Sequence, residues 1–246
     1  MIRPILLLQL RPEDITSDNE YYAILKYGGL QPGEIVRMRI EQTGIPADMD
    51  PRTYSAIIVG GSPFDISTPR ASKPEIQLRI EQDFRQLFDK VIPADIPFLG
   101  ACSGNGLLGD YLGTRVSNRY SEPVGKATLE ITPAGKSDLL LSGFPDRIDV
   151  LLGHKEACDE LPGGATLLIT GSDCPVQMFR VGNNVYATQF HPEGDPEGFT
   201  IRINTYRHHG YFAPDEAEDL IQNVTGVKTP YAQEILRRFV HRYRQA

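Results

Sequence analysis

An apolar run passes into a turn of small residues at Ile96-Pro97-Phe98-Leu99-Gly100-Ala101-Cys102-Ser103-Gly104. This pattern predicts a buried strand, a sharp turn that presents Cys102, and a helix over residues 107–112. Glycines beside the turn leave room where Cβ atoms would collide. The first amides of such a helix favour the thiolate, which is the nucleophilic form of cysteine. The alternative is a structural cysteine beside a glycine-rich loop.

A second segment with chemical character is Tyr186-Ala187-Thr188-Gln189-Phe190-His191-Pro192-Glu193. A strand-like run ends in His191, and Glu193 follows two residues later. Pro192 fixes its own φ and tightens the turn, so that Glu193 can fold back onto the imidazole. A carboxylate in that place would orient His191 as the base that serves Cys102. Taken alone, the same three residues are also typical of a surface turn.

Short apolar strands alternate with helical patterns along the chain, which predicts a parallel sheet covered by helices on both faces. Ser17-Asp18 is expected to cap the first helix, which ends at Gly28-Gly29. A helical tail over residues 215–243 is expected to break near Gly226 and Pro230. The expected strands cover residues 5–8, 34–40, 56–59, 96–99, 127–131, 147–151, 165–169, 176–181 and 185–189. A further helix is expected over residues 74–88.

Length and composition set the class of protein. We expect a single domain over residues 1–246, with a helical C-terminal extension from about residue 213. The net charge of −7 argues against nucleic acid as a partner. Three cysteines are too few for a disulfide scaffold, which favours the reducing cytoplasm. No apolar stretch approaches membrane-spanning length, so no membrane partner is expected.

Taken together, the cysteine turn and the His191 segment resemble a class I glutamine amidotransferase domain. The resemblance extends over about residues 1 to 210 and includes Gly60-Gly61-Ser62-Pro63 and Gly153-His154-Lys155-Glu156. It also includes Leu161-Pro162-Gly163-Gly164-Ala165. Residues 172–182 are most similar to stand-alone members related to the amidotransferase part of GMP synthase. The family implies a flavodoxin-like, three-layer α/β/α fold with a mostly parallel central sheet.

The resemblance also implies roles for matching residues. Cys102 would attack the side-chain amide of glutamine and form a γ-glutamyl thioester, while His191 moves the proton and Glu193 orients His191. The backbone amides of Gly61 and Ser103 would form the oxyanion hole. The resemblance implies that the reaction needs no cofactor. The spacing of histidines and cysteines predicts no metal site.

The substrate pocket is where this sequence departs from the family pattern. The family carries a glutamine that helps to hold the substrate, and Gly106 stands at that position here. The freed slot would admit a larger γ-glutamyl compound or be filled by another residue, with Asn105 as one candidate. Gly60 and His154 are further candidate pocket residues. The loop over residues 62–74 is either a lid over Cys102 or an exposed connection.

Three functions remain open at this point. The first is a glutamine-hydrolysing amidotransferase that releases ammonia for a separate synthetase subunit, because no ATP-binding synthetase motif occurs in this chain. The second is a stand-alone γ-glutamyl hydrolase or peptidase with the same three residues. Glycine instead of glutamine at position 106 favours this second function. The third is a non-catalytic binding protein on the same fold. The presence of all three residues, Cys102, His191 and Glu193, argues against it.

Overall fold

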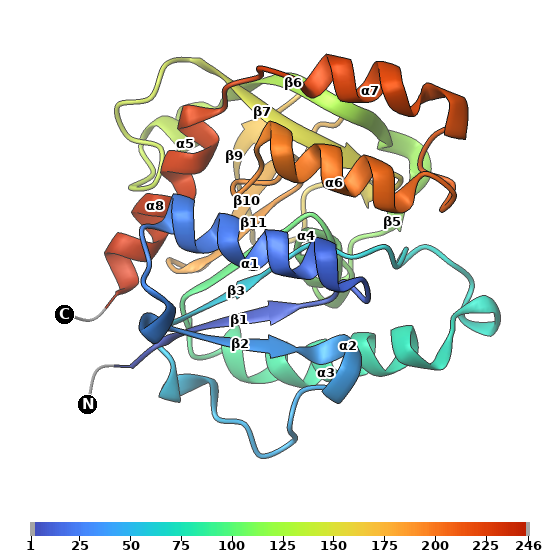
Figure 1. Ribbon diagram of the computed structural model, residues 1–246. Coiled ribbons are helices and arrows are strands. Elements are labelled where there is room, and N and C mark those ends of the chain that lie inside the picture. The colour runs from blue at the N-terminus through green and yellow to red at the C-terminus, as the bar shows by residue number, and fades with distance from the viewer. Residues whose placement is uncertain (1–2, 245–246) are drawn as a thin grey trace.

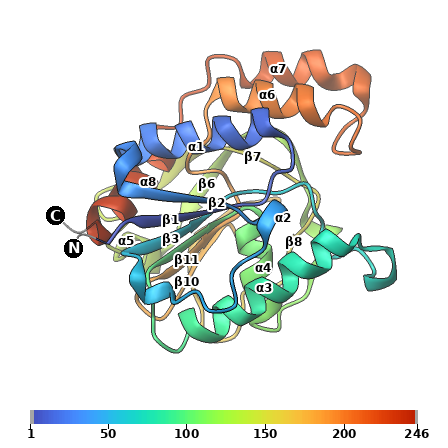
Figure 2. The same ribbon diagram turned by 60° about the horizontal axis from the view of Figure 1, so that its bottom comes forward.

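The computed structural model describes residues 3–244 and has three layers, with a sheet between two layers of helices (Figure 1). The outermost two residues at each end of the expected domain lie outside the described part. Figure 2 shows α1, α6 and α8 over one face of the sheet and α3 and α4 over the other. The expected fold class is therefore confirmed.

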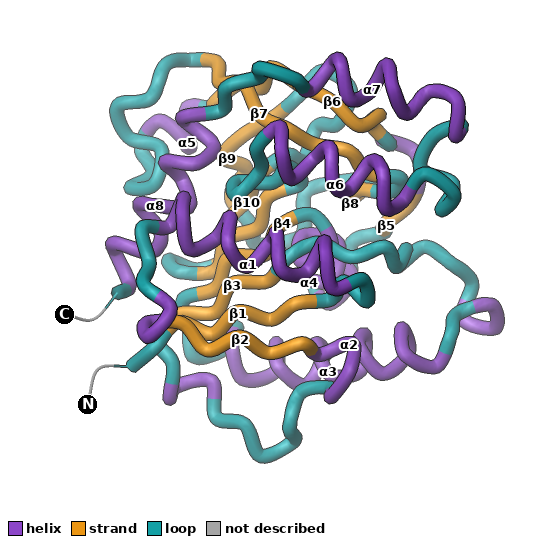
Figure 3. Tube along the Cα trace, viewed as in Figure 1, coloured by secondary structure: helices purple, strands orange, loops and turns teal. Residues whose placement is uncertain are grey.

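The nine-stranded sheet has the order β2-β1-β3-β4-β11-β10-β9-β6-β7 (Figure 3). One half is parallel and contains β2 (Ile35–Arg39), β1 (Ile5–Gln9), β3 (Ala56–Val59), β4 (Phe98–Ala101) and β11 (Val185–Thr188). The other half is antiparallel and contains β10 (Met178–Val181), β9 (Thr166–Thr170), β6 (Glu122–Ile131) and β7 (Arg147–His154). A small ribbon pairs β5 (Val116–Ser117) with β8 (Ala157–Cys158).

Alternating side chains of the central strands build one core on each face of the sheet. In β1, Ile5 and Leu7 enter the core under α1 (Asp14–Gly28) and α8 (Pro230–Tyr243). Leu6 and Leu8 enter the opposite core under α3 (Glu75–Val91) and α4 (Ser103–Tyr111). Strand β1 is buried on both faces, which explains its uninterrupted apolar sequence.

The remaining helices lie at the edges of these layers. They are α2 (Ile40–Thr43), α5 (Pro133–Lys136), α6 (Pro196–Tyr206) and α7 (Ala217–Val224). Helices α6 and α7 pack together over β7, with Leu151, Phe199 and Ile203 in a third apolar cluster. Across residues 3–244, no helix combines the length and the apolar character that crossing a bilayer requires.

Two helix starts differ from the expectation. Helix α1 begins at Asp14 rather than after Ser17-Asp18, because the Ser17 amide already donates to the Glu13 carbonyl at 3.0 Å inside the first turn. Helix α4 begins at Ser103, directly after the cysteine, rather than at residue 107. Helix α6 was not expected, although Asp195 caps it and Pro196 opens it.

Helix α8 belongs to the main core, and this can be tested by removing one ring. Phe239 has no solvent exposure and packs edge-on against Tyr186 of β11, with ring centroids 6.3 Å apart. We predict that Phe239→Ala lowers the free energy of unfolding by about 3–5 kcal/mol, as measured by urea denaturation. Leu139→Ala is the control, because that side chain is 59% exposed and should change stability by less than about 0.5 kcal/mol. A loss below about 1 kcal/mol for Phe239→Ala would contradict this role.

Candidate active site

Cys102 lies in the turn between β4 and α4 with a backbone conformation that L-residues rarely adopt. Its φ is 52° and its ψ is −95°. Such a conformation costs on the order of 1–3 kcal/mol, so the surroundings must hold it. Its amide donates to the Thr188 carbonyl at 2.7 Å, and its carbonyl accepts from the amides of Asn105 and Gly106. A Cβ at Gly100 would lie 2.8 Å from the Gly104 carbonyl carbon, so this turn requires glycine.

His191 and Glu193 follow the end of β11, the neighbour of β4 in the sheet. His191 Nδ1 lies 2.8 Å from Glu193 Oε1, and both side chains are almost fully buried. Arg202 of α6 donates from Nη2 to the same carboxylate oxygen at 2.8 Å. Glu193 has only acceptor atoms when ionised, so Nδ1 carries the proton. The Nε2 nitrogen of His191 donates to none of the residues that the structure describes and is left for chemistry.

The charges around this pair set its protonation. Burial would raise the pKa of Glu193, but the neighbouring His191 and Arg202 outweigh it and hold that pKa well below its usual range. Burial lowers the pKa of His191, and Glu193 opposes that shift only in part. His191 is therefore a neutral imidazole at neutral pH, as a general base must be.

The Cys102 thiol is protonated in this resting state. Burial raises its pKa to about 11, while the positive charges of Arg11 and Arg202 pull in the opposite direction. A cysteine with this pKa needs a base to become a nucleophile. Cys158 and Cys174 are free buried thiols whose pKa values burial raises to about 12.

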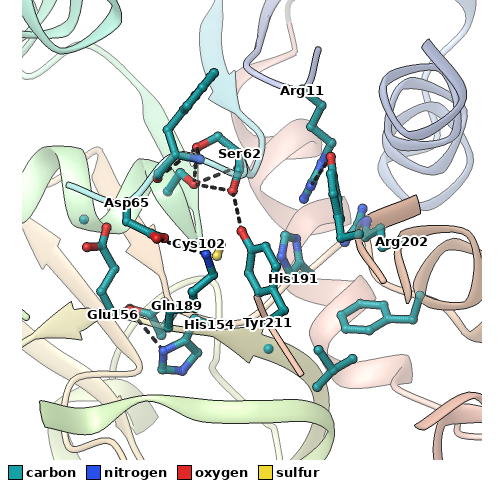
Figure 4. A pocket seen from close by; sticks show the side chains of 18 of the residues that line it. Arg11, Ser62, Asp65, Cys102, His154, Glu156, Gln189, His191, Arg202 and Tyr211 are labelled. Carbon is teal, nitrogen blue, oxygen red and sulfur yellow. Dashed lines mark hydrogen bonds and ion pairs between the residues drawn. The ribbon is translucent and has the colours of Figure 1, made fainter. Parts of the chain in front are cut away.

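Cys102, Ser103, Gly106, His154 and His191 line one cavity (Figure 4). Its volume is about 60 Å³. Cys102 is partly exposed at this cavity.

Part of the loop over residues 62–74, called the lid below, lines the cavity through Ser62, Phe64 and Asp65. The Glu156 carboxylate accepts from the amides of Ile66 and Ser67, at 2.6 and 2.7 Å. Tyr211 donates to the Ser62 carbonyl at 3.3 Å, and Lys155 pairs with Asp65 of the loop at 3.0 Å. The side chains that hold the lid come from residues 155–156 and from the segment after α6.

The two expected oxyanion-hole amides are in different states. The Gly61 amide donates to Glu20 Oε1 at 3.1 Å, and Glu20 is fully buried. Arg11 and Gln9 also donate to the Glu20 carboxylate. The Ser103 amide opens α4 and donates to none of the described residues.

Glu20 explains the first glycine of the loop after β3. A Cβ at Gly60 would lie 2.2 Å from a Glu20 carboxylate oxygen. A Cβ at Gly61 would lie 2.4 Å from Arg11 Nη2 and 2.9 Å from His191 Cε1. Neither position tolerates a side chain, because buried groups approach the backbone from two sides.

The other candidate pocket residues have distinct surroundings. A Cβ at Gly106 would lie 2.9 Å from Ile66 Cδ1, so this side chain of the lid fills the space beside Gly106. Asn105 is fully buried, accepts from the Cys158 thiol at 3.3 Å and is not part of the cavity lining. His154 lines the cavity, and its two ring nitrogens lie 3.1 Å from the Glu156 carbonyl and 2.9 Å from Glu122.

One group of side chains has the composition of a metal site. The ligand atoms of Glu122, His154 and Cys174 lie within 4.8 Å of one another. Glu122 already accepts hydrogen bonds from His154 and Gln177, and both nitrogens of His154 have partners. Hydrogen bonding within the protein therefore accounts for the cluster without a metal.

Sequence reasoning missed the charged groups that surround the Cys102 and His191 pair. Arg11 lies two residues beyond the end of β1, and that position at the carboxyl edge of a parallel sheet was the available signal. Arg202 and Tyr206 lie on α6, which was not expected. Nothing local to Glu20 indicates its contact with the loop after β3.

Comparison with known proteins identifies the family of this chain. Residues 32–204 match the family model described as Glutamine amidotransferase class-I. The chain is 30% identical to the GMP synthase (glutamine-hydrolyzing) of Bacillus velezensis over 186 residues, which cover 71% of this chain and 33% of that protein. The enzyme of the same name from Bacillus subtilis gives the same identity and coverage. The chain thus spans about a third of the length of these curated relatives.

Solved structures share the fold over nearly the whole chain. A glutamine amidotransferase from Thermotoga maritima has a TM-score of 0.74 at 22% identity, with 97% of each chain covered. A glutamine amido transferase from Methylobacillus flagellatus has a TM-score of 0.66 at 15% identity, with 100% of this chain and 98% of that chain covered. The family model covers well over half of the sequence, and the expected resemblance is confirmed: this chain belongs to the class-I glutamine amidotransferase family.

Proposed function

We propose that this chain hydrolyses the side-chain amide of glutamine, or of a γ-glutamyl compound built like it, through a thioester at Cys102. The observation that carries the proposal is the buried, neutral His191, oriented by Glu193 beside the strained cysteine turn. Family membership supports the same reaction class.

The proposed reaction has two steps. His191 Nε2 takes the thiol proton as Cys102 Sγ attacks the amide carbon, and it returns that proton to the departing nitrogen as the C–N bond breaks. Water then attacks the thioester with the same base, the C–S bond breaks, and sulfur regains a proton. Arg202 and Glu193 keep the imidazole in the tautomer that both steps need.

We expect substrate binding to rearrange the resting site. The lid should move as the substrate enters, because it lines a cavity of about 60 Å³. The Gly61 amide must also exchange Glu20 for the substrate oxygen before it can join Ser103 in an oxyanion hole. Both changes involve the same loop, since Gly61 directly precedes the lid.

In the first version of this function, glutamine is the nitrogen donor and the acceptor reaction takes place on a separate chain. The curated relatives are named glutamine-hydrolyzing GMP synthases, and this chain matches a third of their length. We propose that released ammonia passes to a synthetase on another chain. The three free thiols suit a protein of the cytoplasm.

A γ-glutamyl hydrolase is the second version, with the same residues and no acceptor chain. Ile66 of the lid lies against Gly106, so the missing side chain leaves no extra room there for a larger substrate. One observation favours this version: Arg11 and Arg202 line the cavity beyond Cys102 on the His191 side (Figure 4).

Loss of the nucleophile tests the proposal directly. Cys102→Ala should abolish release of glutamate from glutamine and from γ-glutamyl peptides, measured with the purified protein. His191→Ala should cost about 10²–10⁴-fold in rate, the usual contribution of a general base. Cys174→Ala is the matched control, because that thiol is free and buried but is not part of the cavity lining. Turnover by Cys102→Ala near the wild-type rate would exclude the mechanism.

The protonated state of the Cys102 thiol leads to a second prediction, about how its alkylation rate depends on pH. With a thiol pKa near 11, the rate of Cys102 alkylation by iodoacetamide should rise about tenfold per pH unit through pH 10 without reaching a plateau. Mass spectrometry of the peptide that contains residue 102 separates this signal from the other two thiols. A plateau below about pH 8 would instead indicate a preformed thiolate and imidazolium pair.

The acid limb of activity follows from His191. Because the pKa of His191 is lowered, kcat/KM should stay level as the pH falls through 6.5, the ordinary value for histidine, and decline only below it. Glu193→Gln removes the charge that raises this pKa, so the decline should move to still lower pH in that variant. A decline centred above 6.5 would contradict the assignment.

A further inference from the structure

Two buried guanidinium groups lie on the same side of Cys102 as His191 (Figure 4). Arg11 follows β1 and is 4% exposed, and Arg202 lies on α6 and is 7% exposed. Both line the cavity that contains the thiol. Side chains of this kind are rarely buried without a function or a full set of partners.

Neither guanidinium uses all of its donors within the protein. Arg11 donates from Nε to Glu20 and from Nη1 to the Tyr206 hydroxyl, and no described residue accepts from its Nη2. Arg202 donates from Nη2 to Glu193, whereas its Nε and Nη1 are buried without a partner. Buried donors left unpaired are costly, which favours an acceptor that is supplied by a ligand.

The free donor of Arg11 is directed at the reaction centre. A Cβ at Gly61 would lie 2.4 Å from Arg11 Nη2 and 2.9 Å from His191 Cε1. The guanidinium and the imidazole therefore both lie against Gly61. Glu20 and Tyr206 hold the other two nitrogens, and the fork is therefore fixed before any ligand binds.

The chemistry tells which part of a substrate would meet these donors. His191 returns its proton to the nitrogen that leaves, so the leaving group must lie on the His191 side of the thiol. Asp65 and Glu156 lie on the opposite side of Cys102, where the acyl part of the substrate remains (Figure 4). Lys155 pairs with Asp65 at 3.0 Å. Arg11 and Arg202 thus face the leaving group and not the glutamyl part.

Apolar side chains complete this part of the cavity. Phe199 and Ile203 of α6 line it beside Arg202, and Val124 and Phe212 also contribute. Ammonia needs neither an apolar wall nor a guanidinium. An amine with a short carbon skeleton and a carboxylate uses both, because a guanidinium fork matches a carboxylate.

We infer that the preferred leaving group carries a carboxylate, and hence that the substrate is a γ-glutamyl amino acid or a γ-glutamyl dipeptide. Hydrolysis adds one water and gives glutamate and the free amino acid or dipeptide, with no other reactant. The inference rests on the thioester chemistry proposed above and identifies the substrate class of its second version. Arg11 is a specificity-determining residue in this account, and it takes no part in proton transfer.

A matched pair of substrates tests the inference without any variant. γ-Glutamylglycine and γ-glutamylglycinamide differ only in the charge of the leaving group. The wild-type protein should prefer the first by about 10–100-fold in kcat/KM, the range expected for hydrogen bonds to a charged group. Glutamine should be turned over more slowly than γ-glutamylglycine. Equal rates for the pair, or faster turnover of glutamine, would overturn the inference.

Two variants assign the preference to a residue. Arg11→Gln should reduce the preference for γ-glutamylglycine to about threefold or less, with a smaller effect on the amide. Arg11→Lys keeps a charge for Glu20, which protects the fold, but it lacks the planar fork whose separate nitrogens reach Glu20 and the substrate, so the preference should fall as well. Lys155→Gln is the control, because it removes the cation that pairs with Asp65 on the opposite side of Cys102. Loss of the preference in that variant instead of the Arg11 variants would contradict the assignment.

Failure of this inference differs from failure of the proposed mechanism. Labelling of Cys102 by a glutamine-like electrophile such as 6-diazo-5-oxonorleucine reports on the nucleophile and base alone. A protein that is labelled but does not hydrolyse γ-glutamylglycine retains the thioester chemistry and refutes the carboxylate preference. A protein that is neither labelled nor active on any substrate of the panel refutes both.

Discussion

Parallel pairing of β4 with β11 is the constraint on which the site depends. In that register Ala101 lies opposite Thr188, so the residues that follow each strand leave the sheet side by side. The hydrogen bond from the Cys102 amide to the Thr188 carbonyl continues this pairing by one step and holds the strained turn. Cys102 and His191 are 89 positions apart in the chain, and this one register brings both into a single cavity. A slip of β11 by one residue relative to β4 would turn the side chains of β11 to the opposite face and displace His191 from Cys102.

Buried charges form the layer behind these two residues. Glu193 is held by His191 and Arg202, and Glu20 is held by Arg11 and by the Gly61 amide. Such pairs contribute little to stability, because desolvation offsets their attraction. These pairs fix the relative positions of the elements. Arg202 connects α6 to Glu193 beside the histidine, and Glu20 connects α1 to the loop after β3. The fold therefore places charges around the thiol at fixed geometry, where water would otherwise reorganise around each proton transfer.

Local sequence patterns predicted most strands, the cysteine turn and the histidine segment, because each is specified by neighbouring residues. They missed the two-residue strands β5 and β8 and the first half of β6. The features that escaped prediction depend on contacts between distant segments. Arg11 and Arg202 are far apart in the chain, and no local pattern marks an arginine as buried. Ile66 fills the space beside Gly106 only because the lid folds back over α4. Helix α6 is a different case, since Asp195 and Pro196 carried a start signal that was open to prediction.

The position of the lid, the protonated thiol and the occupied Gly61 amide are three aspects of one resting state. Cys102 is partly exposed, and a thiol with a pKa near 11 is a poor target for oxidation. Under the proposed mechanism, a ligand that moves the lid also moves the loop that carries Gly61, which couples substrate binding to release of that amide from Glu20. Binding energy from the rest of the substrate would then contribute to forming the oxyanion hole. In that mechanism the Glu20 carboxylate links recognition to catalysis, because it competes with the substrate oxygen for the same donor.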